Sequence, residues 1–397
     1  MNMNRRDFLA AAMLAPLTVN SHQLFAAEST DIKTLVIFLR GAYDACNFLV
    51  PYTSEDYYEN RPRIAIAQPG SAQDAALKLD NHWGMHPVFQ KTLMPLWEKK
   101  QIAFIPFAGT ADLSRSHFET QDLMESGQPA NGKRAYGSGF LNRLATVLGA
   151  KAQPVSFTNN NPLIMQGPAR IPLIGLSGSG KSIYRDNQIS LLEDLYKNSK
   201  QEKIVAEGVA NHRMMLEEFE KEKEAASRNA VSAKGFDLQV KRMASLMKDK
   251  YSLGFLDIGN WDTHYSQGGA SGMLANQFKN LGSGLKTFAE EMGPQWNKTV
   301  VYVMSEFGRT FRENGSGGTD HGHGSVHWVL GGAINGGKIL GEQTDVSIAA
   351  LNEERDYKVL NNSRDVLGGL FKEIYGLNNA QVQKVFPSSK ASAIKMI

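Results

Sequence analysis

The chain has 397 residues, of which 43 are basic and 40 acidic, and a formal net charge of +3. Its 42% hydrophobic and 21% charged content is typical of globular proteins and excludes a disordered chain, a polytopic membrane protein and a strongly basic nucleic-acid binder. The single cysteine, Cys46, excludes an internal disulfide and a cysteine-rich zinc site, so any metal must be bound by histidines and carboxylates.

Residues 1–27 have the features of an export signal. The paired Arg5 and Arg6 precede the apolar run 9–17, and small residues follow at Ala26 and Ala27. This order predicts a twin-arginine signal peptide, with the twin-arginine export machinery as a partner and a periplasmic or otherwise extracytoplasmic location. The run is too short to cross a bilayer, which needs roughly 20 apolar residues, so we expect no membrane span after signal removal.

Residues 28–397 are expected to form a single α/β domain. Nearly continuous apolar runs predict strands that are buried on both faces, at 35–39, 102–107, 253–258 and 300–304. Periodic patterns between them predict helices at 87–99 and 273–292. This alternation predicts a mostly parallel central sheet with helices on both faces. A segment at about 189–250, rich in Glu, Lys and Ala, is predicted to be a helical insertion, with a solvated charged face at 217–224.

A cluster of polar residues directly follows each predicted strand. These clusters begin at Arg40, Gly109, Gly259 and Ser305. Because the carboxyl ends of parallel strands lie along one edge of a sheet, we expect the clusters to converge there. A fifth, glycine-rich cluster at 317–324 adds three potential ligands in four residues.

Carboxylates and imidazoles together are typical ligands of zinc, manganese or iron, whereas carboxylates alone favour magnesium or calcium. The candidate metal ligands are Asp44, Asp262, His264, Glu306, Asp320, His321 and His323. They predict one or two divalent ions (zinc, manganese, iron or calcium), and two ions roughly 3.5–4 Å apart can bind a transferred phosphoryl group. Ser116 is the candidate nucleophile, with Ser114 as a rival. Arg115 and Arg309 are candidates for holding an anionic substrate, and His117 for orienting the nucleophile.

Each of these residues also has an ordinary structural interpretation. Asp44 can cap a helix, 262–264 can form a turn, and Arg309 can pair with a neighbouring glutamate. His327, in an apolar run, is expected to be a core histidine, and His86, before a predicted helix, is expected to be structural. The shared position after strands favours the metal site over these separate interpretations.

Six segments of the chain resemble a known family. They are Leu39–Asp44, Arg115–Phe118, Gln121–Gly127, Trp261–His264, Ser305–Thr310 and Gly318–Gly322. Together they resemble the bacterial family of unknown function numbered 1501, whose members commonly carry a twin-arginine signal. That family is grouped with the alkaline phosphatase and sulfatase superfamily. The resemblance therefore implies a central sheet, a nucleophile at a helix start and metal ligands in loops at the sheet edge.

The resemblance also implies roles for single residues. Asp44 matches the first metal-bound aspartate and Ser116 the nucleophile. Asp262 and His264 match the aspartate and histidine that bind one metal. Asp320 and His321 match the first two residues of the Asp-His-Gly element. This chain departs from the superfamily in two respects. Glu306-Phe307-Gly308 stands at the strand end where the Asp-His-Gly element is usual, and the Asp-to-His spacing in Asp262-Thr263-His264 is tighter than the usual pattern. The assignment of ligands to ions stays open.

Residues 175–182, Gly-Leu-Ser-Gly-Ser-Gly-Lys-Ser, fit the P-loop pattern. A P-loop follows directly on a strand, but Pro168 and Pro172 interrupt the preceding segment. An exported protein also has little ATP to use. A flexible Gly/Ser loop is therefore the favoured interpretation.

Taken together, the sequence predicts an exported metal-dependent hydrolase of phosphate or sulfate esters, acting on a small molecule or a glycan through a serine nucleophile or metal-bound water. No nucleic-acid partner is expected. One alternative is a non-catalytic exported protein that binds an anionic envelope glycan or lipid. A weaker alternative is a nucleotide hydrolase that uses the P-loop-like segment.

Overall fold

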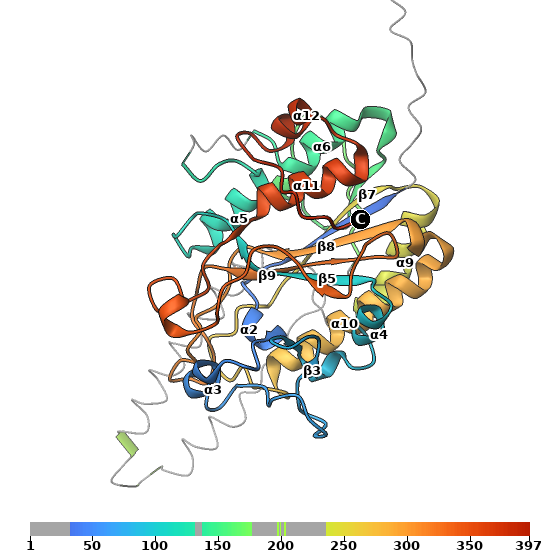
Figure 1. The fold of residues 1–397 in the computed structure, drawn as a ribbon. Helices are drawn as coiled ribbons and strands as arrows, with labels where there is room; N and C mark the ends of the chain where they lie inside the picture. The colour runs from blue at the N-terminus through green and yellow to red at the C-terminus, as the bar shows by residue number, and fades with distance from the viewer. Residues whose placement is uncertain (1–31, 132–136, 177–196, 198, 200–201, 204–235) are drawn as a thin grey trace, which may run out of the picture.

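A computed structural model describes residues 32–131, 137–176, 197, 199, 202–203 and 236–397 (Figure 1). The export signal, residues 177–182 of the P-loop-like segment, the charged run and most of the predicted insertion lie outside these residues. Within the described ranges, no helix is both long and apolar enough to cross a membrane.

The centre of the fold is an eight-stranded sheet in the order β10-β5-β9-β8-β1-β7-β6, with β11 also paired to β5. Its strands are β1 (Lys33–Leu39), β5 (Ile102–Gly109), β6 (Pro154–Ser156), β7 (Leu253–Ile258), β8 (Thr299–Ser305), β9 (Ser325–Leu330), β10 (Lys338–Ile339) and β11 (Asn361–Asn362). Only β9 runs antiparallel to its neighbours, β5 and β8; every other pairing in this sheet is parallel. The predicted α/β class with a mostly parallel sheet is therefore confirmed.

Helices cover both faces of the sheet, as predicted (Figure 1). One face carries α5 (His117–Ser126), α6 (Phe140–Leu148), α11 (Ser363–Tyr375) and α12 (Asn379–Val385). The other face carries α2 (Ala45–Phe48), α4 (Met94–Glu98), α9 (Phe236–Asp249) and α10 (Met273–Met292). The connections contain α3 (Glu55–Asn60), the 3-10 helices η1 (Pro87–Phe89), η2 (Gly149–Lys151), η3 (Leu163–Met165), η4 (Gly293–Lys298) and η5 (Ile348–Ala350), and a small antiparallel sheet of β2 (Leu49–Val50), β4 (Gly84–Met85) and β3 (Leu77–Lys78).

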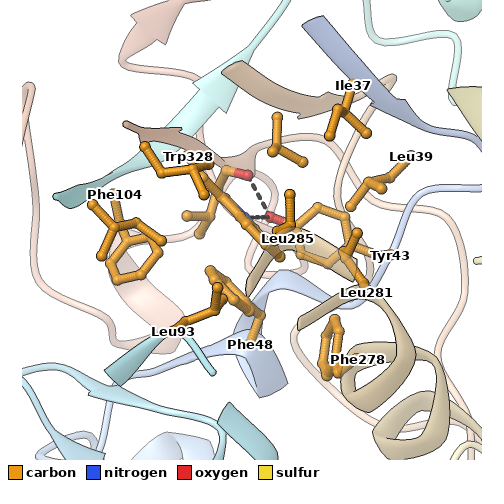
Figure 2. Close-up of a cluster of buried hydrophobic side chains, with 14 of the residues drawn as sticks. Ile37, Leu39, Tyr43, Phe48, Leu93, Phe104, Phe278, Leu281, Leu285 and Trp328 are labelled. Atoms are coloured by element: carbon orange, nitrogen blue, oxygen red, sulfur yellow. Dashed lines mark hydrogen bonds between the residues drawn. The ribbon is translucent and has the colours of Figure 1, made fainter. Parts of the chain in front are cut away.

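Each face of the sheet has its own hydrophobic core, because side chains alternate along a strand. In β1, Ile37 and Leu39 point into the core beneath α9 and α10, whereas Val36 and Phe38 point into the core beneath α6 and α11. Figure 2 shows the first core, where the rings of Phe48 and Trp328 stack with centroids 3.9 Å apart. This double burial explains why the strands read as continuous apolar runs.

The helix predicted at 87–99 is divided into η1 and α4, with turns between them. Pro95 is the physical reason, because it has no N–H with which to continue a helix from residue 91, yet it fits the first turn of α4. The predicted insertion at 189–250 stays a prediction. Its described part includes α9 and the isolated residues near 200.

Candidate metal centre

The polar clusters gather at the carboxyl edge of the sheet, where the parallel strands end. His117 starts α5 after β5, Asp262 follows β7, and Glu306 follows β8. His321 precedes β9, and the antiparallel direction of that strand brings its amino end to the same edge. The strand directions therefore bring segments that are far apart in sequence to one place.

At this edge, three side chains form a group of potential metal ligands, which we call the triad: His117, Asp262 and His321. Their ligand atoms lie within 4.8 Å of one another. The Nε2 atoms of His117 and His321 are 2.9 Å apart. Asp262 places Oδ2 at 3.5 Å from His117 Nε2 and Oδ1 at 3.5 Å from His321 Nε2. Two imidazoles and one carboxylate thus face a common point.

The outer nitrogen of each triad histidine is held by an oxygen acceptor. Nδ1 of His117 lies 2.7 Å from Glu306 Oε1, and Nδ1 of His321 lies 3.0 Å from the carbonyl oxygen of Arg115. A carbonyl oxygen can only accept, so Nδ1 of His321 carries a proton, and an ionised Glu306 requires the same of His117. When both rings are neutral, their two Nε2 lone pairs face each other. Such a pair needs a cation or a proton between its nitrogens.

The charges of the triad are consistent with a shared proton when no metal is bound. Burial lowers the pKa of His117, but the interactions with Asp262 and Glu306 outweigh it and raise the pKa to about 9. Burial also lowers the pKa of His321. For Glu306, burial opposes ionisation, but the bond to His117 prevails and lowers the pKa to about 2. One imidazolium beside two carboxylates therefore stabilises the metal-free site.

His264 and Asp320 flank the triad on its exposed side. His264 Nε2 lies 3.0 Å from His321 Nε2 and 3.0 Å from Asp262 Oδ1, and its Nδ1 lies 3.2 Å from Asp320 Oδ1. The hydrogen bond from His264 lowers the pKa of Asp320 to about 2. The side chains of His321 and Asp320 are 17% and 52% exposed, so the site opens to solvent here.

Both candidate arginines pair with carboxylates. Arg309 is fully buried and donates from Nη1 to Asp262 Oδ1 at 2.5 Å, which holds the pKa of Asp262 well below its usual range despite burial. Arg115 forms ion pairs with Glu353 at 2.8 Å and with Asp356 at 3.2 Å. Arg309 thus neutralises a triad carboxylate, and Arg115 reaches the triad through its backbone oxygen.

Three predicted ligands, Asp44, Glu306 and His323, lie neither in the triad nor in the pair of His264 and Asp320 that flanks it. Both carboxylate oxygens of Asp44 are bonded to Arg61, at 2.5 and 3.1 Å, and Asp44 also caps α2 through Cys46 N. His323 is buried, and burial lowers its pKa. Glu306 contacts the triad only by holding His117.

The two candidate nucleophiles differ in their surroundings. Ser114 is exposed, and its hydroxyl lies 3.1 Å from Asp112 Oδ2 and 3.3 Å from Thr120 Oγ1. Ser116, the N-cap residue of α5, makes no side-chain capping hydrogen bond within the described part of the chain. Ser116 directly precedes the triad residue His117.

The triad fits a divalent cation. Asp262 Oδ2 is buried, and among the described residues it has no hydrogen-bond partner. Ligands at about 2.0–2.1 Å from a tetrahedral ion are about 3.3 Å apart. The two Nε2 atoms are 2.9 Å apart, and each lies 3.5 Å from one of the two Asp262 oxygens. A histidine ligand whose second nitrogen donates to a carboxylate or a carbonyl is usual at metal sites. Two imidazoles and one carboxylate suit zinc, manganese or iron better than calcium.

Two expected structural histidines lie away from the triad. His86 caps η1 through Nδ1, and its Nε2 is 3.1 Å from Gly269 O. His327 is fully buried and bonds Tyr302 through Nδ1 at 2.8 Å.

Sequence reasoning missed the polar side chains that support the triad, above all Gln121 and Gln267. For Gln121 a signal was available, since it lies four residues after His117 on the same helical face.

The fold and the site define an α/β protein with a candidate metal centre at the carboxyl edge of its sheet. The chain belongs to the family described as protein of unknown function DUF1501, whose family model matches residues 33–390. This confirms the family resemblance. A comparison with curated proteins finds no match.

The solved structures that are similar to the chain include two of low sequence identity. One is the crystal structure of Ps i-CgsB in complex with k-i-k-neocarrahexaose, with a TM-score of 0.41, 10% identity, and coverage of 90% of this chain and 75% of that chain. The other is a protein in the alkaline phosphatase superfamily from Vibrio parahaemolyticus, with a TM-score of 0.38, 13% identity, and coverage of 86% and 66%.

Proposed function

We propose that the protein is a metal-dependent hydrolase of phosphate or sulfate esters. The observation that carries the proposal is the triad of His117, Asp262 and His321, with its two facing imidazole nitrogens and a buried carboxylate oxygen that has no hydrogen-bond partner in the described part of the chain. Three protein ligands beside an open position are typical of catalytic rather than structural metal sites. The exposed side, at His321 and Asp320, is where a substrate would enter.

In this proposal the triad holds one divalent ion, with His264 beside it. The ion, when bound, supplies positive charge that stabilises the negative charge developing on the ester oxygens. Glu306 and the carbonyl of Arg115 orient the two triad histidines through their Nδ1 atoms. Arg309 keeps Asp262 ionised and fixed in place.

Ser116 is the proposed nucleophile. It lies at the start of α5, half-buried and next to His117. Its oxygen would attack the phosphorus or sulfur centre, the bond from that centre to the alcohol oxygen would break, and the serine proton would pass to the departing alcohol. Water would later break the new bond to serine, which releases phosphate or sulfate and restores the hydroxyl. Direct attack by water on the same centre is the alternative within this proposal.

One observation favours a second function, a non-catalytic binding protein for an anionic glycan or lipid. Arg309 and Arg115 already pair with carboxylates, so neither is positioned to stabilise a transferred phosphoryl or sulfuryl group. Under this alternative the protein keeps the metal and binds its ligand without turnover. The export signal at residues 1–27 and an extracytoplasmic location remain part of both proposals.

A screen of phosphate and sulfate monoesters tests the choice, with metal-loaded and chelator-stripped protein compared. We expect turnover only in the loaded protein, and its loss in Ser116→Ala. Ser114→Ala is the matched control, because it removes a hydroxyl two residues away, and it should retain turnover. Metal-dependent turnover that survives in Ser116→Ala would leave water as the nucleophile. Metal binding with no turnover of any ester would favour the binding protein.

A further inference from the structure

The turn of residues 40–44, between β1 and α2, contributes no ligand to the triad, yet it is buried against it. Arg40 and Asp44 stand at its two ends and are 1% and 0% exposed. Each begins a chain of hydrogen bonds that ends on a different triad residue. The turn therefore contacts the site from two directions.

The first chain runs from Arg40 to His117. Arg40 Nη1 donates to Gln121 Oε1 at 2.8 Å, and Gln121 Nε2 donates to Glu306 Oε1 at 2.8 Å. The same Glu306 oxygen lies 2.7 Å from Nδ1 of His117. Since a guanidinium can only donate, Gln121 must turn its carbonyl towards Arg40 and its amide towards Glu306. Arg40 is itself fixed by Asp257, at 2.7 Å.

The second chain runs from Asp44 to Asp262. Asp44 Oδ2 accepts from Gln267 Nε2 at 2.6 Å, and Gln267 Oε1 accepts from Thr319 Oγ1 at 3.0 Å. Because the Thr319 hydroxyl has used its hydrogen, it can only accept from Arg309 Nε, at 3.2 Å. Arg309 in turn donates to Asp262 Oδ1. Acceptance by the Asp44 carboxylate therefore fixes the orientation of the Gln267 amide and, through it, the direction of the Thr319 hydroxyl, whereas Arg309 can only donate.

The middle of the turn contacts the site through its backbone. Gly41 N donates to Glu306 Oε1 at 2.8 Å. Gly41 also has a φ of +113°, and a Cβ on it would lie 2.7 Å from the backbone nitrogen of Asp262. Only glycine allows the turn to approach Asp262 this closely.

We propose that Arg40 and Asp44 are positioning residues, which orient His117 and Asp262 for a divalent cation through Gln121 and Gln267. The inference rests on the proposed metal centre but not on hydrolysis. It gives Asp44 a role in the site other than that of a ligand. A purely structural role would need only its ion pair with Arg61.

The test is the Zn²⁺ affinity of the full chain, measured by competition with a chelator, together with the visible absorption of the Co²⁺-loaded protein. Asp44→Asn and Arg40→Lys should each weaken Zn²⁺ binding by about tenfold or more and change the Co²⁺ spectrum. Gln267→Met and Gln121→Met interrupt the chains of hydrogen bonds but keep the buried ion pairs of Arg40 and Asp44. They should therefore have the same effects even if the first two variants fold poorly.

Tyr43→Phe is the matched control. Tyr43 lies in the same turn and is equally buried, but its hydroxyl bonds Val326 O and the Trp328 indole rather than the site (Figure 2). This variant should keep the parent affinity and spectrum. Equal losses in Tyr43→Phe would overturn the inference, and so would parent values in both glutamine variants.

These outcomes separate the inference from the proposed function. Weaker Zn²⁺ binding in the variants, with no ester hydrolysed by the parent, would support the positioning role and contradict the hydrolase. Ester hydrolysis with parent affinity in all variants would do the reverse. A parent that binds neither Zn²⁺ nor Co²⁺ would overturn both.

Discussion

Glu306→Gln gives a quantitative test of how the triad is held. Glu306 is fully buried, and its Oε1 contacts His117 Nδ1, Gln121 Nε2 and Gly41 N at 2.7, 2.8 and 2.8 Å. A glutamine of the same shape removes the charge and offers only one acceptor oxygen. His117 then loses the carboxylate that fixes its ring and makes its Nε2 more basic.

Loss of such an outer partner typically costs 10–100-fold in metal affinity, or about 1.4–2.8 kcal/mol. We therefore expect Glu306→Gln to bind Zn²⁺ at least tenfold more weakly than the parent in chelator competition at pH 8. The fold should be retained, because the neutral amide oxygen can still accept from Gln121 and Gly41.

The matched control is Glu373→Gln on α11. Glu373 is also mostly buried and accepts from two backbone nitrogens, Met396 N at 2.9 Å and Ile397 N at 3.1 Å, but it lies outside the site. This control should bind Zn²⁺ like the parent. A Glu306→Gln variant that also binds like the parent would refute the assignment of His117 Nε2 as a metal ligand.

Three further predictions follow from buried charges and from the P-loop-like segment. Arg309→Met should destabilise the metal-free protein to urea by about 3–5 kcal/mol, because it strands a buried carboxylate, and adding Asp262→Asn should restore part of that loss. Burial lowers the pKa of His86 to about 4 and of His327 to about 3, so unfolding takes up protons below about pH 6.5. Each of these histidines should therefore reduce the free energy of unfolding by up to about 1.4 kcal/mol per pH unit as the pH falls. In His86→Asn the urea concentration at the unfolding midpoint should depend less on pH between pH 6.5 and 4. A pH dependence equal to that of the parent would contradict the assignment. Lys181→Ala should leave Zn²⁺ affinity and ester turnover unchanged. Loss of either would favour the P-loop interpretation of residues 175–182 over the Gly/Ser loop.

The sequence was sufficient for the strands that are buried on both faces. The run 253–258 coincides with β7, and the periodic pattern at 273–292 coincides with α10. The sequence was not sufficient to predict that β9 runs antiparallel to its neighbours, because a buried apolar run does not indicate the direction of its strand. Hydrophobic periodicity also could not show that Pro95 divides the segment 87–99.

For the site, position after a strand was the useful signal. It pointed to Asp262 and His264, whereas His321 came from the glycine-rich cluster at 317–324. The structure places all three within contact of one another. It could not separate a ligand from a supporting residue. Asp44 forms an ion pair with Arg61, which lies in a segment without a recognisable sequence pattern. The orientation of His117 towards His321 depends on where α5 lies in the fold.

Elemental metal analysis of the mature protein, purified without chelator, tests the central claim most directly. His321→Ala removes a triad ligand, and His327→Ala serves as the control because it removes a core histidine outside the site. We predict about one equivalent of zinc, manganese or iron in the parent and in His327→Ala, and little in His321→Ala. A parent that contains no metal and takes up none on soaking, or a His321→Ala variant that retains the full equivalent, would contradict the metal centre.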